Sequence, residues 1–363
     1  MMESEEFGIS YNVKDLILYA LAIGFGTTTE EGNSNNNENE LKYLYERHPN
    51  FVPAQTFCLV LQFWAGNQGY ATTSGLPQFP PPAMTTKNGI IPRNFLKGDL
   101  DISGCPIIHS WQSIVWHHNL PVPTISNSRR NDQVIQTKLC MRTVDVTPKS
   151  VGTFVTTETI VTLVKDTFVP PTICTMQSTA LVLGAPKDQI IPYHTERTAN
   201  LISRPQIPKD TTPILQMTFR VQPNQALVYR LASGDTNHIH VDTSAAKMLG
   251  SDKKSPLLHG LCTLGIAYRA ITSLINTSIG ETIQKLEGRF TKPVFINDVL
   301  CTKIWSDGTF QQDCTSKKSN SRRYLFVVSN VESGETVVNA GIAVIVSSEG
   351  TGPQNQLSNR SRL

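Results

Sequence analysis

One short stretch of the sequence holds several side chains that can accept or donate a proton. In "GDTNHIHVDTSAAKMLG" (234–250), Asp235 is followed closely by Asn237, His238 and His240. The Gly, Asp, Asn, Ser and Thr content is typical of a loop, and loops on rigid scaffolds commonly carry catalytic groups. An Asp and a His together can take a proton from one water molecule and return it, while the Asn holds that water or one of the two side chains. The stretch therefore predicts an acid–base site.

The same residues also have possible structural roles. Asp235 can close an Asx turn, and Asp242 or Thr243 can cap a short helix over "TSAAKML". His238 can be a surface residue. A D-x-N-x-x-H run is not a common metal-ligand spacing, so we expect no metal. The spacing by itself leaves catalysis and loop geometry as alternatives.

A buried helix is predicted directly after this loop, over "SPLLHGLCTLGIAYRAITSLI" (255–275). It opens on His259 and Gly260, and small and apolar residues recur at helical spacing behind them. Backbone N–H groups in a first helical turn lie at the positive end of the helix dipole. They can stabilise negative charge that develops on a carbonyl oxygen. The alternative is that Gly260 merely allows close packing, and the two roles are compatible.

Composition excludes several other classes of protein. The chain has 363 residues, a formal net charge of +3, 39% hydrophobic and 17% charged residues, all ordinary for a globular protein. This charge does not indicate a nucleic-acid partner, and no apolar stretch approaches the ~20 residues of a membrane span. Seven Cys are scattered without a C-x-x-C pair, which favours reduced thiols over disulfides or zinc. The absence of a Gly-rich phosphate loop argues against Rossmann and P-loop enzymes.

The chain is organised as two similar regions around a Pro-rich stretch, 186–212, which we interpret as a linker. The first region is predicted to contain a helix over 105–118 and then long strands rich in Val, Ile and Thr; the second has the helix over 255–275 and four such strands. Strands that follow one apolar helix predict an antiparallel sheet wrapped around it, an α+β fold. The Asn-rich stretch 27–40 is expected to be an exposed loop.

Two motifs carry a resemblance to a known family. "YRLASGDTNHIHVDTSAAKMLG" and "SPLLHGLCTLG" resemble the signature of the (R)-specific 2-enoyl-CoA hydratases, type 2, of the MaoC-like hot-dog superfamily. "KDLILYALAIGFG" and "RFTKPVFINDVL" are similar to other parts of its eukaryotic members. The resemblance implies a double hot-dog: a non-catalytic repeat over 1–185 that accommodates the acyl chain, a linker over 186–212, a catalytic repeat over 213–350 and a flexible tail over 351–363.

The resemblance also implies a role for individual residues. The family's catalytic pair falls on Asp235 and His240, its supporting Asn on Asn237, and its backbone donor to the thioester oxygen on Gly260. The implied reaction is reversible hydration of trans-2-enoyl-CoA to (3R)-hydroxyacyl-CoA, without metal, nicotinamide or flavin. The alternatives are another hot-dog thioester enzyme, such as an acyl-CoA thioesterase or an acyl dehydratase, and a non-catalytic acyl-CoA-binding protein.

The binding of CoA is less clearly marked. Basic residues that could meet its phosphates, with solvated surface as the alternative, are Arg289, Lys292, Lys253 and Lys254. The sequence departs from the family pattern twice. His238 replaces the usual Pro, and the stretch 250–256 is about two residues longer than usual, so we expect a reshaped loop before the helix.

The C-terminal residues predict a location. Ser361, Arg362 and Leu363 resemble the S-K-L tripeptide that an import receptor reads as a peroxisomal address. The preceding "TGPQNQLSN" is polar and predicts a flexible tail. No dehydrogenase is appended, so we expect a separate (3R)-hydroxyacyl-CoA dehydrogenase as a metabolic partner. A homodimer is compatible with the sequence.

Overall fold

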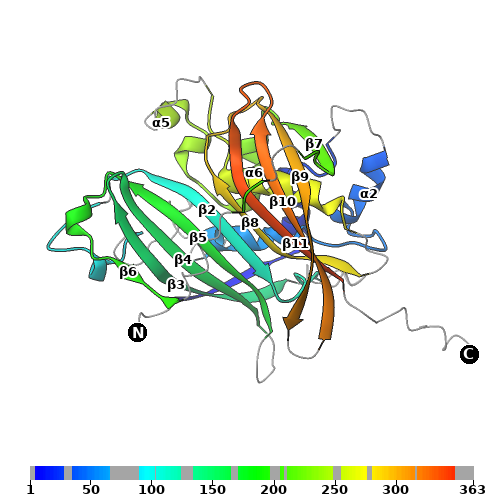
Figure 1. The fold of residues 1–363 in the computed structure, drawn as a ribbon, viewed down its shortest axis with the longest axis horizontal. Coiled ribbons are helices and arrows are strands. Elements are labelled where there is room, and N and C mark those ends of the chain that lie inside the picture. Colours follow the sequence, from blue (N-terminus) through cyan, green and yellow to red (C-terminus); the bar gives the residue numbers. More distant parts are fainter. Residues whose placement is uncertain are drawn as a thin grey trace, which may run out of the picture.

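The strands form one continuous antiparallel sheet (Figure 1). The structure is a computed structural model that describes residues 5–27, 35–65, 90–102, 104–123, 134–164, 171–196, 205–207, 211–247, 255–275, 280–314 and 317–347. The strands of the first half are β1 (Glu5–Tyr11), β2 (Ile107–Trp116), β3 (Ile135–Lys149), β4 (Gly152–Leu163), β5 (Thr172–Leu183) and β6 (Tyr193–His194). Those of the second half are β7 (Leu215–Arg220), β8 (Glu281–Phe290), β9 (Val299–Cys314), β10 (Lys317–Asn330) and β11 (Thr336–Ser347).

The two halves repeat one strand order. The sheet runs β1-β3-β4-β5-β2 in the first half and continues as β8-β11-β10-β9-β7 in the second. The second strand of each half, β2 or β8, therefore lies where the two halves meet. There β2 pairs with β8, with Gln112 opposite Gly288 and Ile114 opposite Leu286. In Figure 1 the cyan and green strands of the first half continue directly into the yellow to red strands of the second. The expected antiparallel α+β architecture is confirmed.

The helices lie against the sheet or link its strands. They are α1 (Val13–Ala22), α2 (Asn35–Leu44), α3 (Leu61–Trp64), α4 (Gln225–Ser233), α5 (Thr243–Lys247) and α6 (Gly260–Thr272). Short 3-10 turns are η1 (Gln55–Val60), η2 (Arg93–Phe95), η3 (Lys187–Gln189) and η5 (His238–His240). Every residue of α6 from Leu261 to Ile271 is buried, as expected for a helix that a sheet wraps around. Among the described residues, no helix is long and apolar enough to cross a membrane.

Two local expectations were wrong. The segment 105–118 contains strand β2 instead of a helix, and the helical segment directly before β2 that is largely buried is η1 with α3, over residues 55–64. Because β2 lies inside the sheet between β5 and β8, it shows a run of buried residues without clear alternation, a pattern that periodicity does not separate from a buried helix. The Asn-rich stretch also differs, because α2 begins at Asn35 within it.

The apolar core joins the two halves. A side-chain carbon placed on Gly265 of α6 would lie 2.4 Å from Ile23, so the glycine permits a close approach of the segment that follows α1. Deeper along α6, Arg269 is 2% exposed and its Nε donates to Glu40 Oε1 of α2 at 2.6 Å. One cluster of buried apolar residues accordingly includes both halves. The domain boundaries at 185, 212 and 350 stay a prediction.

The start of the expected linker packs against the first half. Ile190 is buried and bridges to Leu96, and Tyr193 of β6 pairs with Val146 of β3. Further along, Ile207 contacts a small apolar cluster on β10 and β11. The described parts of 186–212 therefore contact both halves instead of standing clear of them.

Candidate active site

The polar loop is held in place by the end of α4. Gly234 ends this helix in the left-handed conformation (φ 72°), which favours glycine. A side-chain carbon there would lie 3.1 Å from Trp64 of α3, so the loop starts tightly against the first half. The Asn237 N–H then donates to Asp235 Oδ1 at 3.0 Å, and the Ile239 N–H donates to Asn237 Oδ1 at 3.3 Å. The Asx turn that was the structural alternative is present, and it fixes the direction of the Asp235 carboxylate.

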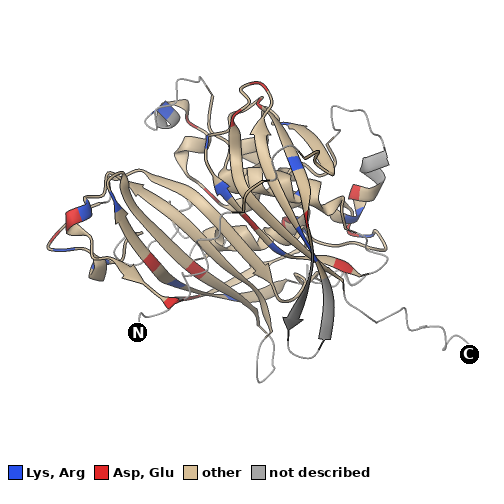
Figure 2. Cartoon of the chain, in the orientation of Figure 1, with Lys and Arg blue, Asp and Glu red and all other residues tan. Residues whose placement is uncertain are grey.

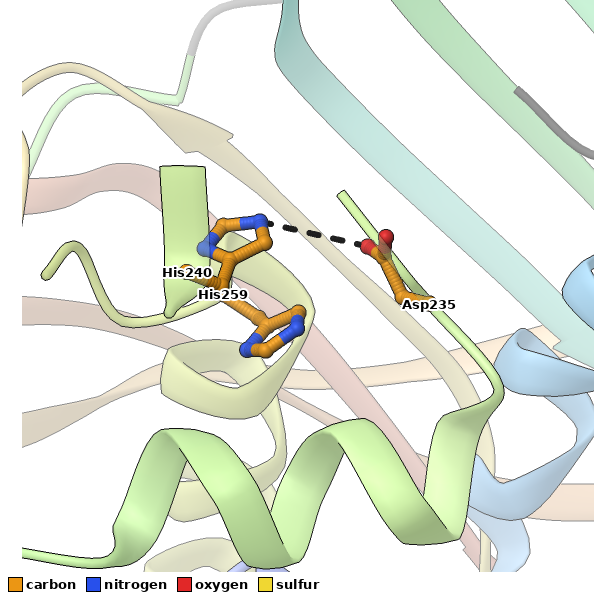
Figure 3. A group of neighbouring side chains, drawn as sticks. All are labelled: Asp235, His240 and His259. Carbon is orange, nitrogen blue, oxygen red and sulfur yellow. Dashed lines mark ion pairs between the residues drawn. The ribbon is translucent and has the colours of Figure 1, made fainter. Parts of the chain in front are cut away.

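Asp235 and His240 face each other inside the protein (Figure 3). Their Oδ2 and Nε2 atoms are 4.0 Å apart, and each residue is 8% exposed. This gap is too long for a direct hydrogen bond and suits one oxygen atom that bridges the two groups. His240 Nδ1 lies 2.9 Å from the Leu257 carbonyl oxygen. Because a carbonyl only accepts, Nδ1 carries the proton, and Nε2 is left as an acceptor that faces Asp235.

Burial governs the protonation of this pair. Burial raises the pKa of Asp235 above its ordinary value, while nearby His240 and the Asn237 N–H lower this pKa by a smaller amount. Burial lowers the pKa of His240, while the Asp235 charge and the Leu257 carbonyl raise this pKa by a smaller amount. The two pKa values are therefore moved toward each other. Such a pair can pass a proton between its members and a bound water with little bias.

His259 is a third member of the site. The sequence placed it at the start of the helix but gave it no role. Its ring stacks on that of His240, with centroids 3.6 Å apart and planes 21° apart, and its other neighbour is the Tyr229 ring at 4.8 Å. Burial and then His240 lower the pKa of His259, which keeps the ring neutral. Neither ring nitrogen has a hydrogen-bond partner among the described residues.

The three residues also raise the question of a metal. One ligand atom from each of Asp235, His240 and His259 lies within 4.8 Å of the others. However, the lone pairs of a stacked pair of rings run side by side within their planes instead of converging on one point. The arrangement favours acid–base chemistry over tetrahedral metal coordination.

Gly260 lies at the point where α6 meets the cavity. It is the first residue of α6, after His259 at the N-cap, so its N–H has no partner within the helix. It lines the same cavity as Asp235 and His240. A side-chain carbon on Gly260 would lie 3.3 Å from the ring of Phe290, so this wall leaves little room. The structure thus brings together the four residues that the resemblance marked as catalytic: Asp235, Asn237, His240 and Gly260.

The cavity extends well beyond these residues into the first half. Its volume is about 410 Å³, within the usual range for small-molecule sites. Strands β2 to β5 contribute Ile107, Met141, Val155 and Ala180 to its wall. At the join between the halves, the ring of His109 lies 4.9 Å from that of Phe290. The sequence had not indicated these residues, because only the three-dimensional pairing of β2 with β8 brings them to the site.

The expected CoA-binding residues have separate positions. Lys292 lines the cavity, is half exposed, and pairs with Glu335 at 2.8 Å. Arg289 does not line the cavity; it precedes Phe290 in β8, and neighbouring strand residues point to opposite faces. Lys253 and Lys254 lie outside the described residues. Figure 2 shows basic and acidic residues dispersed along the ribbon of both halves.

The fold and the site define a double hot-dog protein with an acid–base centre beside an apolar cavity. Comparison with known proteins agrees. Residues 203–328 match the MaoC-like domain, and residues 9–85 match the hydratase 2 N-terminal domain of multifunctional enzyme 2. The crystal structure of a MaoC-like dehydratase from Phytophthora capsici shares the fold, with a TM-score of 0.67, 22% identity and 95% coverage of both chains. By these matches, the chain contains a MaoC-like domain and, before it, a hydratase 2 N-terminal domain.

Curated relatives cover different parts of the chain. A probable enoyl-CoA hydratase 2 from Dictyostelium discoideum is 33% identical over 140 residues, which are 39% of this chain and 43% of the relative. The peroxisomal multifunctional enzyme type 2 of Drosophila melanogaster is 26% identical over 84% of this chain and 42% of its own length. The chain thus matches less than half the length of each of these relatives.

Proposed function

We propose that the protein catalyses the reversible hydration of trans-2-enoyl-CoA to (3R)-hydroxyacyl-CoA. The observation that carries the proposal is the convergence of three groups on one cavity: the Asp235 carboxylate, the unprotonated Nε2 of His240 and the N–H of Gly260 at the start of α6. The names of the family and of the curated relatives support the same reaction.

The proposed chemistry follows from this geometry. A water held between Asp235 and His240 gives one proton to the pair while its oxygen bonds to C3 of the enoyl group. The C2–C3 π bond breaks, and C2 receives a proton from the pair, so that one water is added in total. Negative charge that develops on the thioester oxygen is stabilised by the Gly260 N–H. Acid–base help of this kind contributes about 10²–10⁴-fold, and a single oxyanion donor about 10²–10³-fold.

We assign the acyl chain to the part of the cavity in the first half. Its wall there is largely apolar, as Ile107, Met141, Val155 and Ala180 show. Lys292 is the remaining candidate for the CoA phosphates among the described residues, because it lines the cavity and is half exposed. In this proposal the reaction needs no metal, nicotinamide or flavin, since all of the acid–base groups belong to the chain.

The decisive experiment follows the loss of the enoyl absorbance with trans-2-enoyl-CoA and separates the product by chiral chromatography. The expected product is the (3R)-hydroxyacyl-CoA, with no release of free CoA thiol. Free thiol would identify a thioesterase, and tight binding without turnover would identify an acyl-CoA-binding protein. Asp235→Asn serves as the inactive control, because it keeps the oxygen that accepts from Asn237.

We also propose that the protein acts in peroxisomes. The Drosophila relative is named a peroxisomal enzyme, and the Ser361-Arg362-Leu363 address stays a prediction that lies outside the described residues. A fluorescent fusion that lacks these three residues should move to the cytosol while its purified form keeps full hydratase activity. A truncated fusion that still collects in peroxisomes would contradict the address. A separate dehydrogenase and a homodimer also stay predictions.

A further inference from the structure

Several polar side chains of the first half line the cavity in the part that we assign to the acyl chain. Gln62 of α3 and Ser178 of β5 both line it, beside apolar neighbours such as Phe63 and Met141. A plain hydrocarbon chain would offer no partner to either polar group. Their presence therefore bears on which acyl chains the cavity fits.

Gln62 holds an unsatisfied donor. The residue is 2% exposed, and its Nε2 has no hydrogen-bond partner among the described residues. Buried amide groups are rarely left unpaired, because the loss of hydration is then uncompensated. Since the side chain lines the cavity, the acceptor is expected from the molecule that occupies it.

Ser178 offers the complementary group. Gln112 Nε2 donates to the carbonyl oxygens of Ser113 at 3.1 Å and of Gln177 at 3.2 Å, which fixes the orientation of the Gln112 amide. The Ser178 hydroxyl must then donate to Gln112 Oε1, at 2.5 Å. Its own oxygen keeps acceptor capacity. The cavity wall thus presents a donor from Gln62 and an acceptor from Ser178.

We propose that this part of the cavity is a subsite for a hydroxyl group on the acyl chain, beyond the reacting double bond. Gln62 Nε2 donates to the hydroxyl oxygen, and Ser178 Oγ accepts the hydroxyl proton. A keto group would satisfy Gln62 alone, because it has no proton to give. The inference rests on the proposed function, since it assumes that an acyl thioester enters this cavity.

The test compares plain trans-2-enoyl-CoA with chains of the same length that carry one hydroxyl at successive positions. The readout is the ratio of kcat/KM for the hydroxylated chain to that for the plain chain. In the natural protein this ratio should peak at one position. Gln62→Leu should lower the ratio at that position by about tenfold, the effect of one neutral hydrogen bond and its unpaired partner. Ser178→Ala should also lower the ratio; the loss of its bond to Gln112 Oε1 affects both complexes alike and cancels in the ratio.

A matched control separates this role from a general effect of losing a buried glutamine. Gln225 is 4% exposed and its Nε2 donates to the Ala22 carbonyl oxygen, away from the cavity. Gln225→Leu should lower the thermal stability and leave the ratio as it is. If Gln62→Leu does not fold, Ser178→Ala gives the same comparison. A ratio without a peak, or one that neither substitution changes, overturns the subsite.

Failure of the subsite is distinguishable from failure of the proposed function. Saturated acyl-CoAs, plain and hydroxylated, can be titrated into the protein by calorimetry without any turnover. A hydroxyl-dependent gain in affinity that Gln62→Leu removes would support the subsite even if no enoyl-CoA is hydrated. Equal affinities for both chains, together with normal hydration, would leave the hydratase proposal standing and refute the subsite.

Discussion

Replacing Asp235 by Asn tests the proposed chemistry most directly. The amide keeps an oxygen for the Asn237 N–H, so the loop should hold its shape, but the negative charge is lost. That charge lies 4.0 Å from His240 Nε2, where the imidazolium forms as water gives up its proton. At an effective dielectric constant of about 20, the attraction between two unit charges at this distance is about 4 kcal/mol. Its loss corresponds to about 10³-fold in kcat.

The pH dependence gives a second measure of the same interaction. Activity requires Asp235 ionised and His240 neutral, so kcat/KM should rise with pH along one acid limb. Because burial raises the pKa of Asp235 and lowers that of His240, the two groups should titrate closer together than the free side chains do, which gives a single steep acid limb. In Asp235→Asn the charge that raises the pKa of His240 is gone. The acid limb in the pH profile of the activity that remains in Asp235→Asn should therefore move to lower pH.

Stability should respond in the opposite direction to activity. Burial raises the pKa of Asp235, so the folded state binds this proton more tightly than the unfolded state does. The resulting stabilisation is present at low pH and is lost as pH rises through the folded pKa. At neutral pH the ionised Asp235 thus costs folding free energy, and Asp235→Asn should melt no lower than the natural protein.

The control for the predicted loss of activity in Asp235→Asn is Asp242→Asn. Asp242 lies in the same loop, and its Oδ1 accepts from the Ser244 N–H at 2.7 Å, so the change removes a charge while a cap remains. Its kcat should stay within twofold of normal. The reasoning fails if Asp235→Asn keeps more than a tenth of the normal kcat on trans-2-enoyl-CoA while it is folded by circular dichroism.

Three further outcomes can be checked. Gly260→Ala should lower kcat about tenfold or more with little change in melting temperature, because the added carbon lies 3.3 Å from the Phe290 ring where the thioester must fit. Arg269→Leu should cost about 3–5 kcal/mol in urea unfolding, since it leaves the Glu40 carboxylate buried without its partner. Lys292→Ala should raise KM a few-fold at low salt, and the difference should shrink as ionic strength increases; a salt-independent change would argue against a phosphate contact.

The catalytic loop could be predicted from the sequence because its parts are local. Asp235, Asn237 and His240 lie within six residues, and the turn that orients them uses hydrogen bonds between residues two apart. Helix α6 is equally local, since its apolar and small residues follow one another from Leu261 onward. For such features, spacing along the chain nearly determines spacing in the fold.

The cavity could not be predicted, because its walls come from distant parts of the chain. Gln62 and Ser178 are 116 positions apart, yet both line it. The helix expected over 105–118 was wrong for a related reason: the residues from Trp111 to Ile114 of β2 are all buried, so this part of the strand shows no alternation that the sequence could reveal. Helix α2 likewise forms in an Asn-rich stretch where Glu40 contacts Arg269, a tertiary contact that outweighs weak helix propensity.

The pairing of β2 with β8 explains why a first repeat without the catalytic loop still belongs to the site. It covers the edge that β8 would otherwise expose and brings His109 within 4.9 Å of Phe290, the ring that contacts Gly260. In the proposed function, proton transfer takes place on a loop of the second half and the acyl chain lies against the sheet of the first. Substitutions in that sheet can change which chains are accepted while the acid–base pair stays as it is. Substrate range and reaction chemistry can then be altered separately, although both halves share one core.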